Sequence, residues 1–291
     1  MTDAVWLASY PKSGNTWLRL LFAAVEKGGY LPDINALSGA IASDRRSFEA
    51  ALLVDSAILT DDETEALRSA ALKAQARSVW PHSASRECNA LQLVKVHDRY
   101  AHLPDGTALL GGRRVACGVI VVVRDPRDVA VSLAHHLGVS IDQAIFNLNS
   151  SDFCLSETSD RPALQLRQRL GSWSDHVESW LDQDDLPVCM VRYEDLCSDL
   201  FAELQRVLVF LGIEVGDHVV RAAAAAADFD NLRAVEQKHG FIEWQRNARS
   251  PGFFRQGKTG AWRNDLTPSQ VRRVELAHAS VMDRLGYLSF K

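Results

Sequence analysis

The sequence lacks the cysteine patterns of a disulfide framework or of a zinc site. Its 291 residues include five cysteines, which are scattered and form no Cys-x-x-Cys pair. An odd, scattered set of this kind is typical of reduced thiols in a cytoplasm. We therefore expect a cytoplasmic protein whose chemistry does not depend on a cysteine-bound metal.

An excess of positive charge and long apolar runs are also missing. The formal net charge is −5 at pH 7, whereas a surface that binds nucleic acid needs a cluster of basic side chains along one face. No apolar run approaches the roughly 20 residues that span a bilayer, and the first residues lack the basic and apolar segments of a signal peptide. We expect neither a nucleic-acid partner nor a membrane span, and any bound anion must be held by a local cluster of donors.

The apolar pattern that is present predicts alternating strands and helices. Strands are expected at residues 5–9, 91–97, 118–123 and 187–193. Helices are expected at residues 16–26, 60–77, 125–136, 164–181, 201–211 and 267–285. Neither an internal repeat nor a linker interrupts this order, so the sequence predicts a single α/β domain over residues 1–291.

A glycine-containing turn joins the first strand to the first helix. Residues 10–17 read Tyr-Pro-Lys-Ser-Gly-Asn-Thr-Trp, and a strand, such a turn and a helix form the layout of a phosphate site. The turn is not a Walker loop, because Asn15 stands where the lysine should be and Lys12 lies inside the turn. Backbone N–H groups at a helix N-terminus and one cation can bind phosphate without a metal. A surface turn into an ordinary helix is the alternative for this stretch alone.

A charged cluster follows the third predicted strand. In an open α/β sheet, ligands bind at the carboxyl ends of strands, and residues 121–128 read Val-Val-Val-Arg-Asp-Pro-Arg-Asp. Arg124 offers a fork of donors suited to phosphate, and Ser132 lies just over two helical turns further on. A solvated strand end with an Arg–Asp pair explains this string equally well when it is taken alone.

A Lys-x-His pair ends the second predicted strand. Lys95 and His97 lie on the same face, because strand residues alternate. Histidine is suited to general-base work near neutral pH, and a neighbouring lysine can stabilise negative charge on a leaving phosphate. Since the chain has nine histidines, an incidental histidine is the alternative.

These strings together resemble the cytosolic-type sulfotransferases, which use 3′-phosphoadenosine 5′-phosphosulfate (PAPS). Residues 10–17 resemble the family's 5′-phosphosulfate loop, with Asn15 where threonine is common. Further matching strings lie at residues 95–97, 121–132, 171–180, 193–195 and 254–263. The resemblance covers residues 5–31 and most of 91–285. It implies a P-loop-kinase-like sulfotransferase fold, with a central, mostly parallel β-sheet flanked by helices.

The resemblance implies a role for each matching residue around the nucleotide. Lys12 would touch the leaving-group bridge, Trp17 would stack on adenine, and Arg124 and Ser132 would bind the 3′-phosphate. Two aromatic rings would hold the adenine, and a C-terminal loop, with Gln256 in place of a lysine, would fold over the 3′-phosphate. The implied nucleotide-binding residues are Lys12, Ser13, Gly14, Asn15, Thr16, Trp17, Arg124, Ser132, Tyr193, Phe229, Arg255, Gln256 and Gly257.

The resemblance also implies a reaction. His97 would act as general base, Lys12 and Lys95 would neutralise charge on the leaving group, and adenosine 3′,5′-bisphosphate (PAP) would leave without help from a metal. The acceptor would be the hydroxyl or amine of a small molecule. Residues 32–90 would be a variable, mostly helical insertion on the acceptor side, and a homodimer is expected, although the family's dimer motif is matched only in part. The alternatives are a P-loop-like small-molecule kinase and a non-catalytic nucleotide-binding regulator.

Overall fold

The computed structural model describes residues 4–37, 40–78, 91–156, 164–244, 252–254 and 257–288. The chain forms two compact units, each assembled from three segments. Unit 1 consists of Met1–Tyr10, Gly39–Val121 and Ser151–Met190. Unit 2 consists of Pro11–Ser38, Val122–Ser150 and Val191–Lys291. Whether residues 1–291 act as a single domain stays a prediction.

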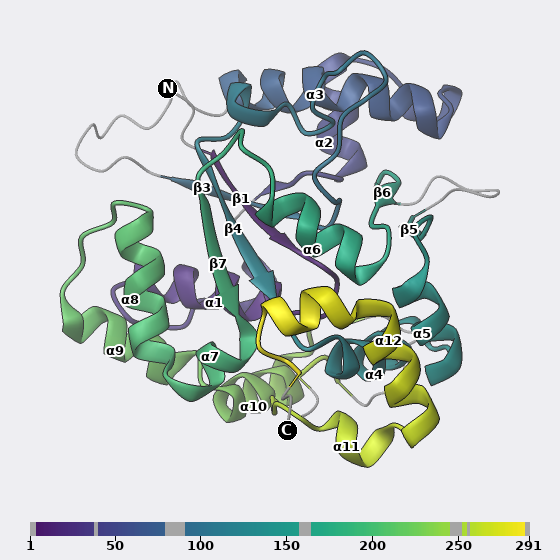
Figure 1. Ribbon diagram of the computed structural model, residues 1–291. Helices are drawn as coiled ribbons and strands as arrows, with labels where there is room; N and C mark the ends of the chain where they lie inside the picture. The colour runs from purple at the N-terminus through teal and green to yellow at the C-terminus, as the bar shows by residue number, and fades with distance from the viewer. Residues whose placement is uncertain are drawn as a thin grey trace. The chain divides into compact units, whose positions relative to one another are not determined.

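Unit 1 contains a five-stranded sheet in the order β2-β3-β1-β4-β7, and the last two residues of β4 and of β7 belong to unit 2. The strands are β1 (Ala4–Ser9), β2 (Ala40–Ile41), β3 (Gln92–Val96), β4 (Gly118–Val123) and β7 (Val188–Arg192). Both β1 and β2 pair with β3 in parallel, and the labelled strands β1, β3, β4 and β7 can be followed in Figure 1. Every residue of β1 and β4 is buried, which explains their uninterrupted apolar sequences. The predicted α/β class and central parallel sheet are confirmed.

The register of the sheet determines where the predicted catalytic strand ends. Ala8 of β1 pairs with Val96 of β3. Because parallel strands end at the same edge of a sheet, Ser9 and His97 follow this pair at one edge. The register thus brings the last residue of β1 next to the predicted general base.

Within the described residues of unit 1, three helices and a small hairpin complete the regular structure. The helices are α2 (Arg45–Leu52), α3 (Asp61–Ser78) and α6 (Trp173–Leu181), and the hairpin pairs β5 (Cys154–Leu155) with β6 (Gln168–Arg169). Short 3₁₀ turns lie at Ser56–Ile58 and Gly112–Arg114. The reciprocal hydrogen bonds of Thr60 and Glu63 form a capping box at the start of α3, where a helix was expected from residue 60. The described part of residues 32–90 is mostly helical, and it adds β2 to the sheet.

The predicted helix over residues 164–181 is wrong in its first half. Residues 168–169 form β6, and α6 begins only at Trp173. Leu164, Leu166 and Leu170 follow an alternating pattern that favours an extended chain. Ser172 then starts the helix through a capping box with Asp175.

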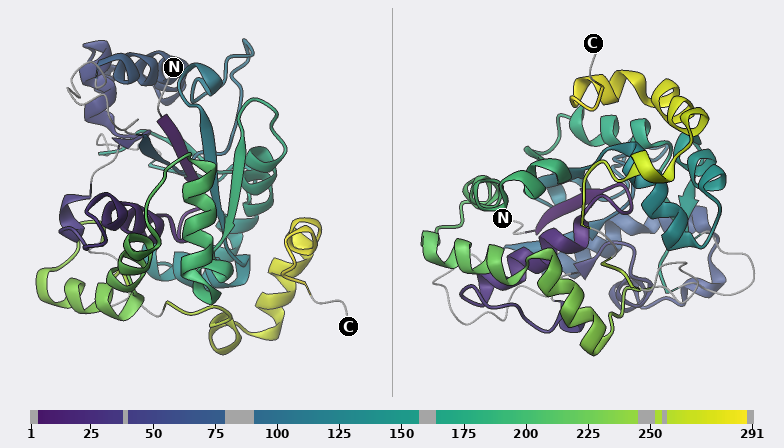
Figure 2. Two further views of the ribbon diagram at one scale, coloured as in Figure 1. Left: turned by 90° about the vertical axis from the view of Figure 1, so that its left-hand side faces the viewer. Right: turned by 90° about the horizontal axis from the view of Figure 1, so that it is seen from below.

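Unit 2 is helical. Its helices are α1 (Asn15–Glu26), α4 (Pro126–Leu137), α5 (Ile141–Asn149), α7 (Tyr193–Ser198), α8 (Leu200–Phe210), α9 (Asp217–Ala226), α10 (Phe229–His239), α11 (Trp262–Asp265) and α12 (Pro268–Arg284), with a 3₁₀ turn at Ile34–Ala36. α1 packs against α9, and α12 packs against α4 and α5 (Figure 2). Among the described helices none could cross a membrane alone by length and apolar composition; the pair of α4 and α5, bent by 117°, meets that requirement jointly.

Candidate active site

The loop between β1 and α1 has a backbone that depends on glycine. Gly14 has φ 112°, and a Cβ at this position would lie 2.8 Å from Cδ2 of Tyr193. Only glycine combines this φ with such a close approach. Ser13, the residue before Gly14, is fully buried, and its Oγ has no hydrogen-bond partner among the described residues. A buried, unpartnered hydroxyl beside a helix N-terminus is suited to an oxygen of an anionic ligand.

Two side chains of this loop have partners that the sequence did not reveal. Nζ of Lys12 lies 3.8 Å from the centroid of the Phe253 ring. Oγ1 of Thr16 donates to Glu243 at 3.0 Å, and Arg19 forms an ion pair with the same carboxylate at 2.6 Å. Asn15 is buried at the first position of α1. Glu243 was missed because it lies 227 residues from Thr16, so no local pattern connects the two.

Arg124 joins three of the elements that the resemblance assigns to the nucleotide. Its Nη1 donates to the carbonyl of Lys12 at 3.3 Å, and its Nη2 donates to the carbonyl of Lys258 at 3.1 Å. Its guanidinium carbon lies 4.2 Å from the centroid of the Tyr193 ring. The Nε of Arg124 is buried and has no hydrogen-bond partner among the described residues. A guanidinium held in this way, with a donor left over, suits a phosphate group.

The other residues of the charged cluster have mostly structural contacts. Arg127 forms an ion pair with Asp125 at 2.7 Å and a second with Glu275 at 2.6 Å. Asp128 accepts hydrogen bonds from the backbone N–H groups of Gly260 and Trp262 at 2.7 and 2.9 Å. Asp128 therefore fixes the C-terminal loop to the first turn of α4. Ser132 lies half-buried on the same helix.

The aromatic residues assigned to adenine form two groups in unit 2. Trp17 is 9% exposed, and its Nε1 donates to the carbonyl of Ala227 at 2.8 Å. Its ring meets Tyr193 edge-on, with 5.6 Å between the centroids. Phe229, the first residue of α10, packs directly on the backbone of Gly257. The structure therefore brings Trp17 to Tyr193 and Phe229 to Gly257, whereas Arg255 and Gln256 lie outside the described residues.

Replacing Gly257 by alanine is expected to destabilise the protein by about 2 kcal/mol or more. A Cβ at Gly257 would lie 2.3–2.5 Å from three ring atoms of Phe229, and overpacking of this kind typically costs about 1–3 kcal/mol. Gly212→Ala is a matched control, because Gly212 has a similar φ of 66° with nothing within 4 Å of its Cβ position. Thermal unfolding of both variants measures the difference. Equal losses would show that only backbone strain is felt.

His97 at the end of β3 is held in one tautomer. Its Nδ1 lies 2.8 Å from the backbone carbonyl oxygen of Ser9. A carbonyl can only accept, so Nδ1 carries the hydrogen. In the neutral ring the lone pair is therefore on Nε2, which is the nitrogen that can take a proton. Lys95 lies two residues earlier and is half-buried.

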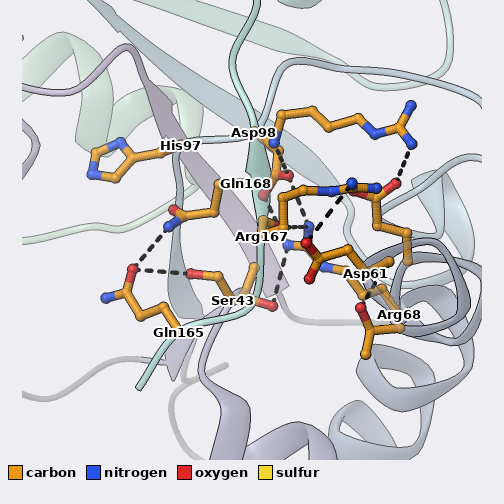
Figure 3. A network of polar contacts seen from close by, with 12 residues as sticks. Ser43, Asp61, Arg68, His97, Asp98, Gln165, Arg167 and Gln168 are labelled. Carbon is orange, nitrogen blue, oxygen red and sulfur yellow. Dashed lines mark hydrogen bonds and ion pairs between the residues drawn. The ribbon is translucent and has the colours of Figure 1, made fainter. Parts of the chain in front are cut away.

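The backbone that follows β3 is fixed by helices on the same unit. His176 donates from Nε2 to the carbonyl of His97 at 3.1 Å, and Trp180 donates from Nε1 to the carbonyl of Asp98 at 2.9 Å. The carboxylate of Asp98 forms a bidentate pair with Arg68 of α3 at 2.8 Å, with both side chains 1% exposed (Figure 3). These contacts position His97, and they join residues that lie too far apart in the chain for a local pattern to predict them.

His176 is expected to make stability fall as the pH is lowered. Burial, with a smaller effect of Arg99, lowers the pKa of His176 from 6.5 to about 3. Its folded pKa is below its unfolded pKa, so its contribution is complete above pH 6.5 and is lost as the pH falls toward 3. The slope is about 1.4 kcal/mol per pH unit in this window. Urea unfolding of wild type and His176→Gln from pH 7.5 to 5.5 measures it.

The expected result is a weaker pH dependence in His176→Gln, since glutamine keeps a donor but does not titrate. Trp180→Phe removes the neighbouring hydrogen bond without removing a titrating group, and it should keep the wild-type pH dependence. Parallel pH curves for wild type and His176→Gln would contradict the assignment.

The comparisons with known proteins decide the family. The family described as "Sulfotransferase domain" matches residues 2–286. The chain belongs to the sulfotransferase family. This sulfotransferase is 23% identical to mouse sulfotransferase 2B1, over 96% of its own length and 71% of the relative's. It is 25% identical to cytosolic sulfotransferase 17 of Arabidopsis thaliana, over 98% and 76% of the two lengths.

Solved structures share the fold. Mouse sulfotransferase SULT7A1 complexed with PAP has a TM-score of 0.58 at 21% identity, over 97% of this chain and 85% of that chain. Retinol dehydratase in complex with androsterone and PAP has a TM-score of 0.61 at 18% identity, over 97% and 81%. The prediction of an enzyme that transfers a sulfuryl group is confirmed by the family, and the kinase and regulator alternatives are not favoured.

Proposed function

We propose that this sulfotransferase takes its sulfuryl group from PAPS and binds the nucleotide through unit 2. Every described residue that the resemblance assigns to nucleotide binding belongs to this unit. The observation that carries the proposal is Arg124, whose guanidinium contacts Lys12, Lys258 and Tyr193 and retains a buried, unpartnered Nε. The donors present fit the nucleotide's two anionic ends, namely the loop at α1 for the 5′-phosphosulfate and Arg124 for the 3′-phosphate.

The proposed reaction is an in-line displacement at sulfur. The acceptor oxygen or nitrogen forms a bond to sulfur while the bond from sulfur to the bridging oxygen breaks, and PAP leaves. Nε2 of His97 takes the acceptor's proton, and its tautomer is the one that the Ser9 carbonyl enforces. Lys12 and Lys95 neutralise charge on the bridging oxygen. Positioning and electrostatics supply most of the acceleration, as in phosphoryl transfer.

The proposal includes a small-molecule acceptor, a metal-independent reaction and a cytoplasmic location. The names of two Arabidopsis relatives describe cytosolic sulfotransferases, and the neighbour retinol dehydratase binds androsterone, a small molecule. Among the described residues, no group of three or more His, Cys, Asp or Glu side chains could hold a metal ion. A homodimer stays a prediction.

Calorimetric titration with PAP in the presence of a chelator, beside ADP with magnesium, tests the donor. Micromolar or tighter binding of PAP without metal is the expected result, followed by PAPS-dependent release of PAP when an acceptor is added. Preference for ADP with magnesium, or no binding of PAP, would contradict the proposal.

A further inference from the structure

The backbone of β6 is bonded to the residues that follow the catalytic strand. The N–H of Arg99 donates to the carbonyl of Arg169 at 2.8 Å, and the N–H of Arg169 donates to the Asp98 carboxylate at 3.0 Å. His97 directly precedes Asp98, and Gln168 directly precedes Arg169. The chain therefore places Gln168 of β6 close to the proposed general base, within unit 1.

Alternation along the two segments decides which side chains share a face. Arg167 and Arg169 both reach Glu65 of α3, at 2.7 and 2.6 Å, and Asp98 reaches Arg68 of the same helix. Because successive residues of an extended chain point to opposite faces, Gln168 and His97 point away from α3. Figure 3 shows both side chains on the side opposite the arginine network.

The side chain of Gln168 is largely buried, and only the nitrogen of its amide has a hydrogen-bond partner among the described residues. Gln168 is 2% exposed, and its Nε2 donates to Oε1 of Gln165 at 2.9 Å. Oε1 of Gln165 also accepts from Oγ of Ser43 at 3.4 Å, so the partner amide is fixed in turn (Figure 3). Oε1 of Gln168 has no hydrogen-bond partner within the described ranges. Oε1 is not among the fully buried unpartnered side-chain atoms of the described residues, so it keeps some contact with solvent. An acceptor molecule that covers this oxygen without donating to it would leave it unpaired, which typically costs about 1–3 kcal/mol.

We propose that Gln168 selects acceptors that carry a second hydrogen-bond donor besides the hydroxyl that is sulfated. Its Oε1 accepts a hydrogen bond from this second hydroxyl or N–H group, while Gln165 and Ser43 hold the amide in place. The inference rests on the proposed function, because it places the acceptor beside His97. A polar group that a bound acceptor buries without pairing disfavours the analogue that lacks the matching group. The favoured class is therefore a diol, polyol or amino alcohol rather than a monohydroxy compound.

Matched pairs of acceptors that differ by one hydroxyl group test the assignment. Phenol is compared with catechol, and cyclohexanol with cyclohexane-1,2-diol, through kcat/KM for release of PAP from PAPS and through binding of each compound to the complex with PAP. We expect wild type to favour the diol by about ten- to a hundredfold, which corresponds to the roughly 1–3 kcal/mol of one buried polar group. Gln168→Met, of similar size, should use both members of a pair equally.

Two further variants keep the test decisive. Gln143→Met changes an exposed glutamine of α5 and should keep the wild-type preference. Gln168→Asn keeps an amide one methylene shorter, and it should reduce the preference if Gln168→Met does not fold. Equal use of both members by wild type, or use of neither, would overturn the proposal. So would an unchanged preference in the folded Gln168 variants.

PAP affinity, measured first on each protein, separates this proposal from the one on which it rests. Absence of PAP binding in wild type contradicts the proposed function. Normal PAP affinity with no diol preference contradicts only the role of Gln168.

Discussion

Replacing His97 by asparagine is expected to lower kcat by about 10²–10⁴-fold, the usual contribution of a general base. Asparagine can still donate to the Ser9 carbonyl from a position near that of Nδ1, but it offers no basic nitrogen at the position of Nε2. The hydrogen bonds from His176 to the backbone of residue 97 and from Trp180 to residue 98 do not involve the His97 ring. Turnover of PAPS should therefore fall while the affinity for PAP, measured by calorimetry, stays within about twofold, a change below roughly 0.5 kcal/mol.

His102→Asn is the matched control for this experiment, because His102 is an exposed histidine of the same unit. Its turnover should equal that of wild type. A fully active His97→Asn enzyme would remove His97 from the mechanism. A loss of PAP affinity equal to the loss of turnover would make His97 a structural residue.

Replacing Arg124 by alanine is expected to weaken PAP binding by about ten- to 150-fold. This range corresponds to roughly 1.5–3 kcal/mol for a hydrogen bond to a charged group. The variant also loses the contacts to the carbonyls of Lys12 and Lys258, so the two loops that would enclose the nucleotide are no longer joined. Calorimetric titration measures the affinity.

Titration with AMP, which lacks the 3′-phosphate, locates the contact. If Arg124 binds the 3′-phosphate, then Arg124→Ala should lose much more affinity for PAP than for AMP. Equal factors for the two ligands would mean that Arg124 supports the 5′-phosphate loop instead. Arg206→Ala, an exposed arginine of α8 that pairs with Glu203, should change neither affinity.

Features with a local signal could be predicted from the sequence. The uninterrupted apolar run at 118–123 predicted a buried strand, which the structure contains as β4. The last helix was expected from residue 267, and the structure has a capping box of Thr267 and Gln270 there. The loop at residues 10–17 was recognisable because its glycine, lysine and helix start lie within eight residues. Such features depend on neighbours in the chain, so spacing alone reveals them.

Features that depend on distant partners could not be predicted. The carboxylate of Asp98 pairs with Arg68, 30 residues earlier, and the ring of His97 meets a carbonyl 88 residues away. Gln168 was assigned to a helix, and its place beside His97 follows from backbone hydrogen bonds between β6 and residues 98–99. No spacing rule encodes such pairs, because they arise only when the sheet and its helices pack.

The tautomer of His97 follows from its shorter contact with Ser9, in which Nδ1 lies 2.8 Å from the main-chain oxygen and 3.4 Å from the side-chain Oγ. Any residue that keeps β1 in place presents the same carbonyl, so alanine scanning of position 9 would pass over this contact, and variation at position 9 among relatives would say little about its importance. Only a change to the peptide group itself, such as an ester in place of the amide that follows Ser9, would weaken the acceptor. Part of the proposed catalytic machinery therefore depends on the backbone geometry of a strand, which substitution of side chains leaves unchanged.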